Sequence, residues 1–431
     1  MRSLRKSIAV CLLLSLVYSA IGQLKTKAKS TPAKVQTVLS GADQTSLYLP
    51  LIKGKKVGIF ANQTSMVGNT HLVDTLLKSG IEIKKIFSPE HGFRGNADAG
   101  EHVTSSIDPT TGIPIISLYG EHRKPTAEDL KDVDVMVFDI QDVGLRYYTF
   151  ISSLQEYIEA SITYNKPLIV LDRPNPNGFY VDGPVLEDGF ESFVGMQKIP
   201  VVYGMTTGEY AKMLLGEKLL NRVLYQYTDS PTAQLVLIGK ANVTVIPCKN
   251  YDHNTYYELP IKPSPNLPNM QSVLLYSSIC FFEGTEVSLG RGTDKPFQVY
   301  GHPSFPDSLF SFTPISTPGA KNPPLQDKRC YGYDLSNPAI DIKKKASKQI
   351  NLSYLLNAYK LFPNKDSFFL RPKKGNPATS DYFFNKLAGN DKLMWQIMNY
   401  KTEADIRKSW LPGLVAFKKI RKKYLLYKDF E

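Results

Sequence analysis

Acidic side chains stand at several positions where the sequence could support acid–base chemistry. Glu90 is the clearest, because it lies between a proline and a histidine in the polar segment S-P-E-H-G-F-R-G at residues 88–95. Hydrolysis of a glycosidic bond uses two carboxyl groups, one protonated to assist the leaving oxygen and one ionised as base or nucleophile. We expect Glu90 to be the acid, and the candidates for the second carboxylate are Asp139, Asp142, Asp172 and Glu283. The catalytic residues predicted in this way are Glu90, Glu283 and Asp142.

Other polar side chains accompany these carboxylates and could hold a polar ligand. Amides, arginines and a histidine follow the apolar runs of the chain, and such a set offers both hydrogen-bond partners and titratable groups. The predicted binding residues are Asn62, His91, Arg94, Asp139, Gln141, Arg146, Asp172, Arg173, Asn175, Asn266 and Arg291.

Short apolar runs precede most of these polar segments and predict the strands that position them. The runs cover residues 56–60, 83–87, 113–118, 133–140 and 167–171. Each is mainly apolar and bounded by turn residues, which is typical of strands buried on both faces. Helices are predicted between and after them, at residues 71–79, 126–131, 146–164 and 206 to about 220. Alternation of strands and helices indicates a mostly parallel sheet.

The predicted fold class is α/β, a Rossmann-like, doubly wound, mostly parallel sheet with a second, smaller α+β domain. In such a sheet ligands bind beyond the carboxyl ends of the strands, where the polar segments lie. From about residue 256 the chain becomes richer in proline and glycine and ends in a basic, helical tail. We therefore expect a signal peptide at 1–22, a Rossmann-like catalytic domain at 23–255 and an α+β domain at 256–431 that closes the cleft.

Several cofactor sites are disfavoured by the absence of their motifs. No G-x-G-x-x-G follows the first predicted strand, no Walker lysine follows the glycines at 92 and 95, and no G-x-S-x-G is present. A metal site is the stronger rival, since His71, His91, His102 and His122 lie close together in the sequence. No H-E-x-x-H or similarly spaced ligand pair occurs among them, so we expect no metal and no other cofactor.

At the same residues the chain resembles the exo-β-N-acetylmuramidases of the NamZ type, formerly a domain of unknown function. The resemblance starts with the S-P-E-H-G-F-R-G segment and continues with F-D-I-Q-D-V-G at 138–144 and L-D-R-P-N-P at 171–176. It then includes P-S-P-N-L-P at 263–268, F-E-G-T at 282–285, G-R-G-T-D-K-P-F at 290–297 and R-K-K-Y at 421–424. These motifs span about residues 35–428 in the family's order. One departure is Asp182, which stands where the family pattern V-E-G-P has a glutamate.

The resemblance implies release of N-acetylmuramic acid from the non-reducing end of peptidoglycan fragments, in a cleft between a Rossmann-like domain and a smaller one. Glu90 matches the family's proposed catalytic glutamate. The lactyl carboxylate of the sugar suits a bidentate arginine, for which Arg94, Arg146, Arg173 and Arg291 are candidates. The amides of Asn62, Gln141, Asn175 and Asn266 suit its hydroxyl and N-acetyl groups.

The first residues predict export. Arg2, Arg5 and Lys6 precede an apolar run at 8–17, and small residues at 20–22 offer a cleavage site. This run is too short to span a bilayer, so we expect no stable membrane insertion after cleavage and a periplasmic or secreted protein. The net charge of +12 indicates a solvated basic surface, with attraction to an anionic polymer such as cell wall as the alternative. No nucleic-acid motif accompanies the charge, so we expect no nucleic-acid partner. The cysteines Cys248, Cys280 and Cys330 specify no disulfide pairing.

Two other functions fit the same residues. A non-catalytic peptidoglycan-binding protein would bind the sugar without turnover. A metal-dependent amidase or esterase acting on the wall would lose its activity to a chelator.

Overall fold

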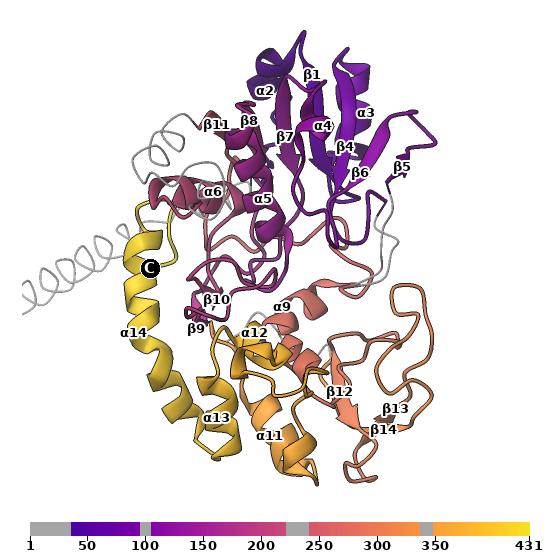
Figure 1. Cartoon of the computed structure of the whole chain (residues 1–431), viewed down its shortest axis with the longest axis vertical. Helices are drawn as coiled ribbons and strands as arrows, with labels where there is room; N and C mark the ends of the chain where they lie inside the picture. Colours follow the sequence, from indigo (N-terminus) through magenta and orange to yellow (C-terminus); the bar gives the residue numbers. More distant parts are fainter. Residues whose placement is uncertain (1–35, 95–104, 221–240, 337–347) are drawn as a thin grey trace, which may run out of the picture. The chain divides into compact units, whose positions relative to one another are not determined.

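The computed structural model describes residues 36–94, 105–220, 241–336 and 348–431. Residues 38–431 form one compact unit, shown in Figure 1. The predicted signal peptide and the basic residues 343–345 lie outside the described residues. Within those ranges no helix combines the length and the apolar character needed to cross a bilayer.

A seven-stranded sheet forms the first part of the unit, in the order β11-β8-β7-β1-β4-β6-β5. Its strands are β1 (Lys56–Ala61), β4 (Glu82–Ser88), β5 (Ser106–Ile107), β6 (Pro114–Ser117), β7 (Val135–Asp139), β8 (Leu168–Leu171) and β11 (Val243–Ile246). All neighbours pair in parallel except β5, which runs antiparallel to β6. The six parallel strands, numbered along the chain, lie in the order 3-2-1-4-5-6 of a Rossmann sheet.

Successive side chains of a strand point to opposite faces of the sheet, and helices cover both faces, so both are buried. Phe60 and Phe138 pack against Tyr157 of α5 (Phe150–Thr163), on the face that α6 (Thr207–Gly216) also covers. Val57 and Ile59 point the other way, toward α2 (Thr45–Ile52) and α3 (Leu72–Lys78). The short helix α4 (Ala127–Leu130) starts at a Thr126 capping box. The doubly wound sheet predicted from the apolar runs is confirmed.

The second part combines helices with a small antiparallel sheet in the order β12-β14-β13. Its strands are β12 (Val299–His302), β13 (Phe310–Phe312) and β14 (Cys330–Asp334). Its helices are α9 (Met270–Ile279), α11 (Ser353–Leu361), α12 (Phe383–Ala388), α13 (Lys392–Met398) and α14 (Glu403–Arg421), with 3-10 turns η1 (Cys280–Gly284), η2 (Lys365–Ser367) and η3 (Thr379–Asp381). Two two-stranded ribbons complete the fold, β2 (Met66–Val67) with β3 (Thr70–His71), and β9 (Asp182–Val185) with β10 (Pro200–Val202). A smaller antiparallel domain beside the parallel sheet is as predicted.

The C-terminal tail returns to the first part (Figure 1). After α14 the Tyr427 hydroxyl donates to the buried carboxylate of Asp172, and the backbone amide of Leu426 donates to Glu209 at 2.8 Å. Arg421, itself buried, forms an ion pair with Asp429 at 2.8 Å. The last residues of the chain therefore complete the polar interior around α6.

The sequence left open the pairing of the cysteines, and the structure shows them unpaired. Cys248, Cys280 and Cys330 are buried and form no disulfide, so each packs as a small apolar side chain.

Helix α5 begins at Phe150 rather than at residue 146, and α6 ends at Gly216 rather than near residue 220. Lys218 has a φ of 57°, a left-handed conformation that cannot continue the helix.

Candidate active site

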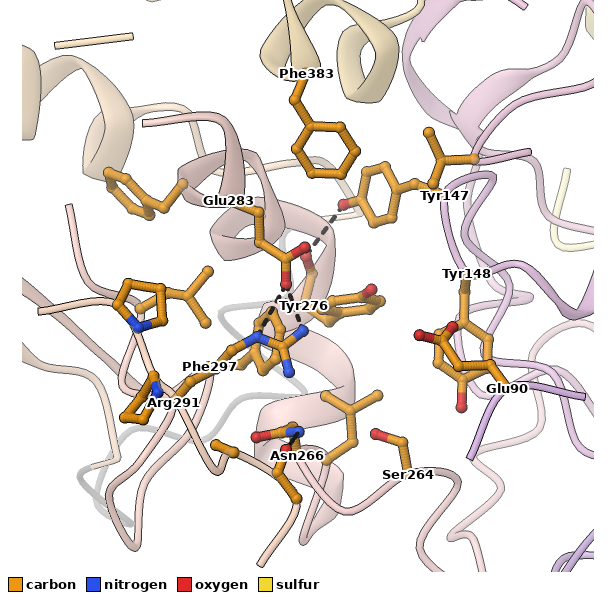
Figure 2. Close-up of a pocket in the computed structure, with 18 of the residues that line it drawn as sticks. Glu90, Tyr147, Tyr148, Ser264, Asn266, Tyr276, Glu283, Arg291, Phe297 and Phe383 are labelled. Atoms are coloured by element: carbon orange, nitrogen blue, oxygen red, sulfur yellow. Dashed lines mark hydrogen bonds and ion pairs between the residues drawn. The ribbon is translucent and has the colours of Figure 1, made fainter. Parts of the chain in front are cut away.

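A pocket of about 1080 Å³ lies where the two parts of the unit meet. The loops after β4 and β6 and the start of α5 form one wall, and η1 with the segments at 264–267, 285–297 and 319–325 forms the other. Figure 2 shows Glu90 on one side and Glu283 on the other, with aromatic rings between them. Of the predicted site residues, the pocket is lined by Glu90, His91, Asn266, Glu283 and Arg291.

The wall formed by the sheet presents Glu90 at the end of β4. The hydroxyl of Tyr119, in the loop after the neighbouring strand β6, donates to Glu90 Oε1 at 3.0 Å. His91, the next residue, is buried and has a φ of 69°, which residues other than glycine adopt rarely and often at functional sites. The turn at His91 directs the chain away from the strand, and Glu90 is left half-buried at the pocket wall.

The opposite wall presents Glu283 in an ion pair. Arg291 Nη2 lies 2.5 Å and Nε 3.2 Å from the same carboxylate oxygen, Oε1. The guanidinium also lies over the ring of Phe297, 4.9 Å from its centroid. Burial opposes the charge of Arg291, yet Glu283 holds the pKa of the guanidinium above its ordinary value. Arg291 therefore keeps its charge, and its two hydrogen bonds fix the Glu283 carboxylate in place.

Tyrosines join the two walls. The Tyr147 hydroxyl donates to the carbonyl oxygens of Tyr276 at 3.0 Å and Ser277 at 2.8 Å, and that of Tyr148 donates to the Pro263 carbonyl at 2.9 Å. The Tyr276 ring meets that of Phe297 edge to face at 4.7 Å. Burial raises the pKa of Tyr147 and of Tyr148 well above the ordinary value, so both remain neutral donors. The pocket thus has an apolar, aromatic lining, which suits the faces of sugar rings.

Asn266 contributes an amide from the proline-rich segment at 263–268. Its Nδ2 donates to the Gly319 carbonyl at 2.7 Å, which fixes the orientation of the side chain at the pocket. Gly319 has a φ of 90°, and a Cβ there would lie 2.5 Å from Pro265, so this close approach requires glycine.

Comparison with known proteins matches nearly the whole chain. Residues 57–271 match the family model described as exo-β-N-acetylmuramidase NamZ, N-terminal, and residues 274–427 match its C-terminal counterpart. The chain belongs to the NamZ family. Peptidoglycan β-N-acetylmuramidase NamZ from Bacillus subtilis (strain 168) is 35% identical over 432 residues, covering 94% of this chain and 96% of that relative.

Two solved structures have the same fold. Both are crystal structures of DUF1343 family proteins from Bacteroides fragilis NCTC 9343. One has a TM-score of 0.79 and 47% identity, covering 91% of this chain and 100% of that chain. The other has a TM-score of 0.72 and 26% identity, covering 92% and 100%. The predicted family and fold class are confirmed.

Several predicted acids and arginines of this NamZ family member lie away from the pocket. Asp139 and Arg173 form a buried bidentate ion pair, with Nε to Oδ1 at 2.6 Å and Nη2 to Oδ2 at 2.8 Å. Asp172 accepts from Thr206, Thr207 and the Gly208 amide, and so holds the start of α6. Arg94 pairs with the buried Asp108 at 2.6 Å.

Asp142 and Arg146 are also buried outside the pocket. Asp142 Oδ2 accepts from the Gly144 amide at 2.6 Å and from the Tyr203 hydroxyl, and burial raises the pKa of Asp142 to about 7. Arg146 donates to three carbonyls, of Pro184 at 2.9 Å, Ile199 at 2.7 Å and Leu387 at 2.8 Å. The structure does not bring either side chain to Glu90 and Glu283, and the catalytic role of Asp142 stays a prediction.

The remaining predicted amides support loops. Asn62 Oδ1 accepts from both the amide and the hydroxyl of Thr64, at 2.9 and 2.6 Å. Gln141 Nε2 donates to the Pro174 carbonyl at 2.7 Å, and Asn175 Nδ2 donates to that of Met205 at 2.7 Å. Asp182, at the family's glutamate position, pairs with Arg407 at 3.0 Å and accepts from the Ile350 amide. The three amides hold strand-end loops and Asp182 joins β9 to α14, so none of the four lines the pocket.

Sequence reasoning missed several residues that line the pocket, above all Tyr119, Arg123, Tyr148 and Glu286. Tyr119 and Arg123 lie in the loop after the predicted strand at 113–118. Glu90 was predicted because it lies in the loop after another strand, and the same signal could have identified these two residues. Glu286 directly follows the F-E-G-T motif at 282–285. The motif therefore identified this segment as part of the site but did not include Glu286. Among the described residues no cluster of three or more His, Cys, Asp or Glu side chains could hold a metal ion.

Proposed function

We propose that this protein is an exo-β-N-acetylmuramidase that releases N-acetylmuramic acid from the non-reducing end of peptidoglycan fragments. The observation that carries the proposal is the presence of two glutamates, Glu90 and Glu283, on facing walls of one aromatic-lined pocket in a NamZ family fold. The relative from Bacillus subtilis is named as a peptidoglycan β-N-acetylmuramidase. A pair of carboxyl groups flanking a sugar site is what glycosidic hydrolysis requires.

In this proposal Glu90 is the general acid and Glu283 the ionised carboxylate. Glu90 protonates the oxygen that leaves with the glucosamine residue, while Glu283, paired with Arg291, acts on the anomeric side as base or nucleophile. The rings of Tyr276 and Phe297 offer surfaces for the sugar, and Asn266 offers an amide at the same site.

A single incubation tests the activity. The purified protein is incubated with the muramic-acid–glucosamine disaccharide, with and without EDTA, beside a Glu90→Gln variant. We expect free N-acetylmuramic acid in both wild-type samples and at least a ~100-fold slower release by the variant, the scale of lost general-acid assistance. Binding without turnover would instead favour a non-catalytic binding protein, and loss of activity to EDTA would favour a metal-dependent enzyme.

The second carboxylate is tested by comparing two variants. Glu283→Gln and Glu286→Gln remove the other two carboxylates that line the pocket in the described part of the chain. We expect Glu283→Gln to lose turnover as Glu90→Gln does and Glu286→Gln to keep most of it, with similar melting temperatures for all three. The reverse order of effects would transfer the role to Glu286.

We also propose that residues 1–22 direct export, so that the enzyme meets its substrate in the periplasm or outside the cell. The basic start and the short apolar run of this segment support the proposal. N-terminal sequencing of the protein from the native host tests it, and a mature chain starting near residue 23 is expected.

A further inference from the structure

Arg123 places a guanidinium at the pocket wall. It follows Tyr119 in the loop after β6, on the same side of the pocket as Glu90. Its Nε donates to the Gly120 carbonyl at 2.7 Å, and its guanidinium lies over the ring of Phe193, 4.4 Å from the centroid. Phe193 also lines the pocket. The bond and the ring together hold the plane of the guanidinium, while both terminal nitrogens remain for another partner.

The charge of Arg123 is not neutralised within the described part of the chain. No carboxylate of those residues lies within ion-pair distance of it, whereas Arg291, the other arginine at the pocket, is committed to Glu283. The remaining predicted arginines are also committed, Arg94 to Asp108, Arg173 to Asp139, and Arg146 to three backbone carbonyls. Arg123 is therefore the arginine of the pocket that is available to an anionic group of a ligand.

We propose that Arg123 determines specificity by binding the lactyl carboxylate of the muramic acid unit. This inference rests on the proposed function, because that carboxylate distinguishes N-acetylmuramic acid from N-acetylglucosamine. An arginine whose terminal nitrogens are both available binds a carboxylate with two parallel hydrogen bonds, which fixes orientation as well as charge. Tyr119, four residues earlier, contacts Glu90. One loop would thus join recognition of the lactyl group to the catalytic acid.

The test compares two ligands that differ at the lactyl group, a charged carboxylate in one and a neutral methyl ester in the other. Muramic-acid–glucosamine disaccharide and its lactyl methyl ester are offered to the wild type, to Arg123→Met and to Arg123→Lys, and kcat/KM is measured. Because Arg123 is exposed, water screens the interaction, and we expect the wild type to prefer the acid by about tenfold, the low end for a charge-assisted bond. The preference should fall to about one in Arg123→Met and be partly kept in Arg123→Lys.

Arg329→Met provides the matched control. Arg329 is also exposed and also contacts a ring, that of Tyr331 at 5.7 Å, but it does not line the pocket. This variant should keep the wild-type preference for the acid. A preference that survives in Arg123→Met, or that is absent from the wild type, would overturn the inference.

The experiment separates this inference from the proposed function. If the wild type cleaves neither disaccharide, the proposed function fails, and the same comparison is made by calorimetry with N-acetylmuramic acid and its methyl ester as ligands. Tighter binding of the acid that is lost in Arg123→Met would still support the role of Arg123. Equal binding of acid and ester by the wild type would contradict the proposed role of Arg123.

Discussion

At the scale of single residues, burial separates the carboxylates that can react from those that support the fold. Glu90 and Glu283 line a pocket, whereas Asp139, Asp142 and Asp172 are fully enclosed among partners of the fold. All five follow short apolar segments and look alike in the sequence. A polar residue beyond a buried strand either turns outward to a ligand or turns back to satisfy loop amides, and local sequence does not distinguish the two.

Asp142 makes stability depend on pH. Burial raises its pKa from 3.8 to about 7, so between these values the folded protein binds more protons than the unfolded chain. The stabilising contribution is thus complete below about pH 4 and is lost as the pH rises through 7. Its ceiling is on the order of 4 kcal/mol. Asp142→Asn cannot ionise, so we expect its free energy of unfolding to fall less than that of the wild type between pH 5 and pH 8.

Urea denaturation at both pH values checks this expectation. Asp188→Asn serves as the control, because Asp188 is an exposed acid that pairs with the exposed Lys198. Its pH dependence should follow the wild type. Equal pH dependence in Asp142→Asn and the wild type would show that Asp142 is ionised in the folded protein at pH 5.

At the scale of elements, strands were easier to predict than the helices that flank the pocket. The strands β1, β4, β7 and β8 are rich in buried apolar residues, and their predicted bounds lie within two residues of the observed ones at each end. The segment at 146–149 was assigned to a helix because its residues are compatible with one. In the structure Arg146, Tyr147 and Tyr148 instead direct their polar groups to carbonyls of other segments, and α5 starts only after them. Such long-range partners are invisible in a local pattern.

The predicted binding residues that instead support the fold were misassigned for the same reason, because their partners lie far away in the sequence. Arg146 was expected to bind a ligand, yet two of its carbonyl partners lie in or beside the ribbon β9–β10 and the third in α12. That third partner lies 241 residues along the chain. No spacing rule relates positions so far apart. What the sequence did locate was the Glu90 loop and the motifs at 263–268, 282–285 and 290–297, from which the pocket is built.

Arg146 is expected to be essential for stability. Arg146→Met removes a donor from three buried carbonyl oxygens, of which that of Ile199 still accepts from the Leu186 amide at 3.2 Å. The loss of the other two bonds costs about 1–3 kcal/mol each, so a loss of at least about 2 kcal/mol is expected. Arg371→Met, the control, removes an exposed arginine with one long bond to a carbonyl and should change stability by less than about 0.5 kcal/mol. Chemical denaturation measures both, and similar effects of the two substitutions would contradict the role given to Arg146.

At the scale of the whole molecule, the pocket is assembled from two parts that the chain visits in turn. Its walls come from loops of the parallel sheet and from segments of the second part, and tyrosine hydroxyls bridge them. A site assembled in this way more naturally receives the end of a glycan than a stretch of its interior. The family resemblance points the same way, toward exo cleavage.

Exo cleavage predicts a specific product pattern. A defined glycan capped with glucosamine at its non-reducing end should yield nothing until the cap is removed, and free N-acetylmuramic acid afterwards. Chromatography with mass detection of the products distinguishes this result from endo cleavage. Internal fragments from the capped chain would show that the pocket admits a continuous polymer.

The C-terminal tail contributes to the interior of the first part. Tyr427→Phe removes the hydroxyl that donates to the buried Asp172 and should lower the free energy of unfolding by about 1–3 kcal/mol. Tyr382→Phe, which alters a tyrosine of the second part outside the pocket, is the comparison, and its effect should be smaller. Equal, small effects in thermal melts would mean that Asp172 does not depend on the tail.

The contact between Asp172 and Tyr427 also sets an order of events during synthesis. Asp172 lies 255 residues before its partner, and a ribosome adding about 5–20 residues per second needs between about 10 and 50 s to cover that distance. During this interval the nascent Rossmann-like half lacks a donor that its interior requires. The sheet can assemble early, but it reaches its final stability only after Tyr427 has been added and its hydroxyl has reached Asp172.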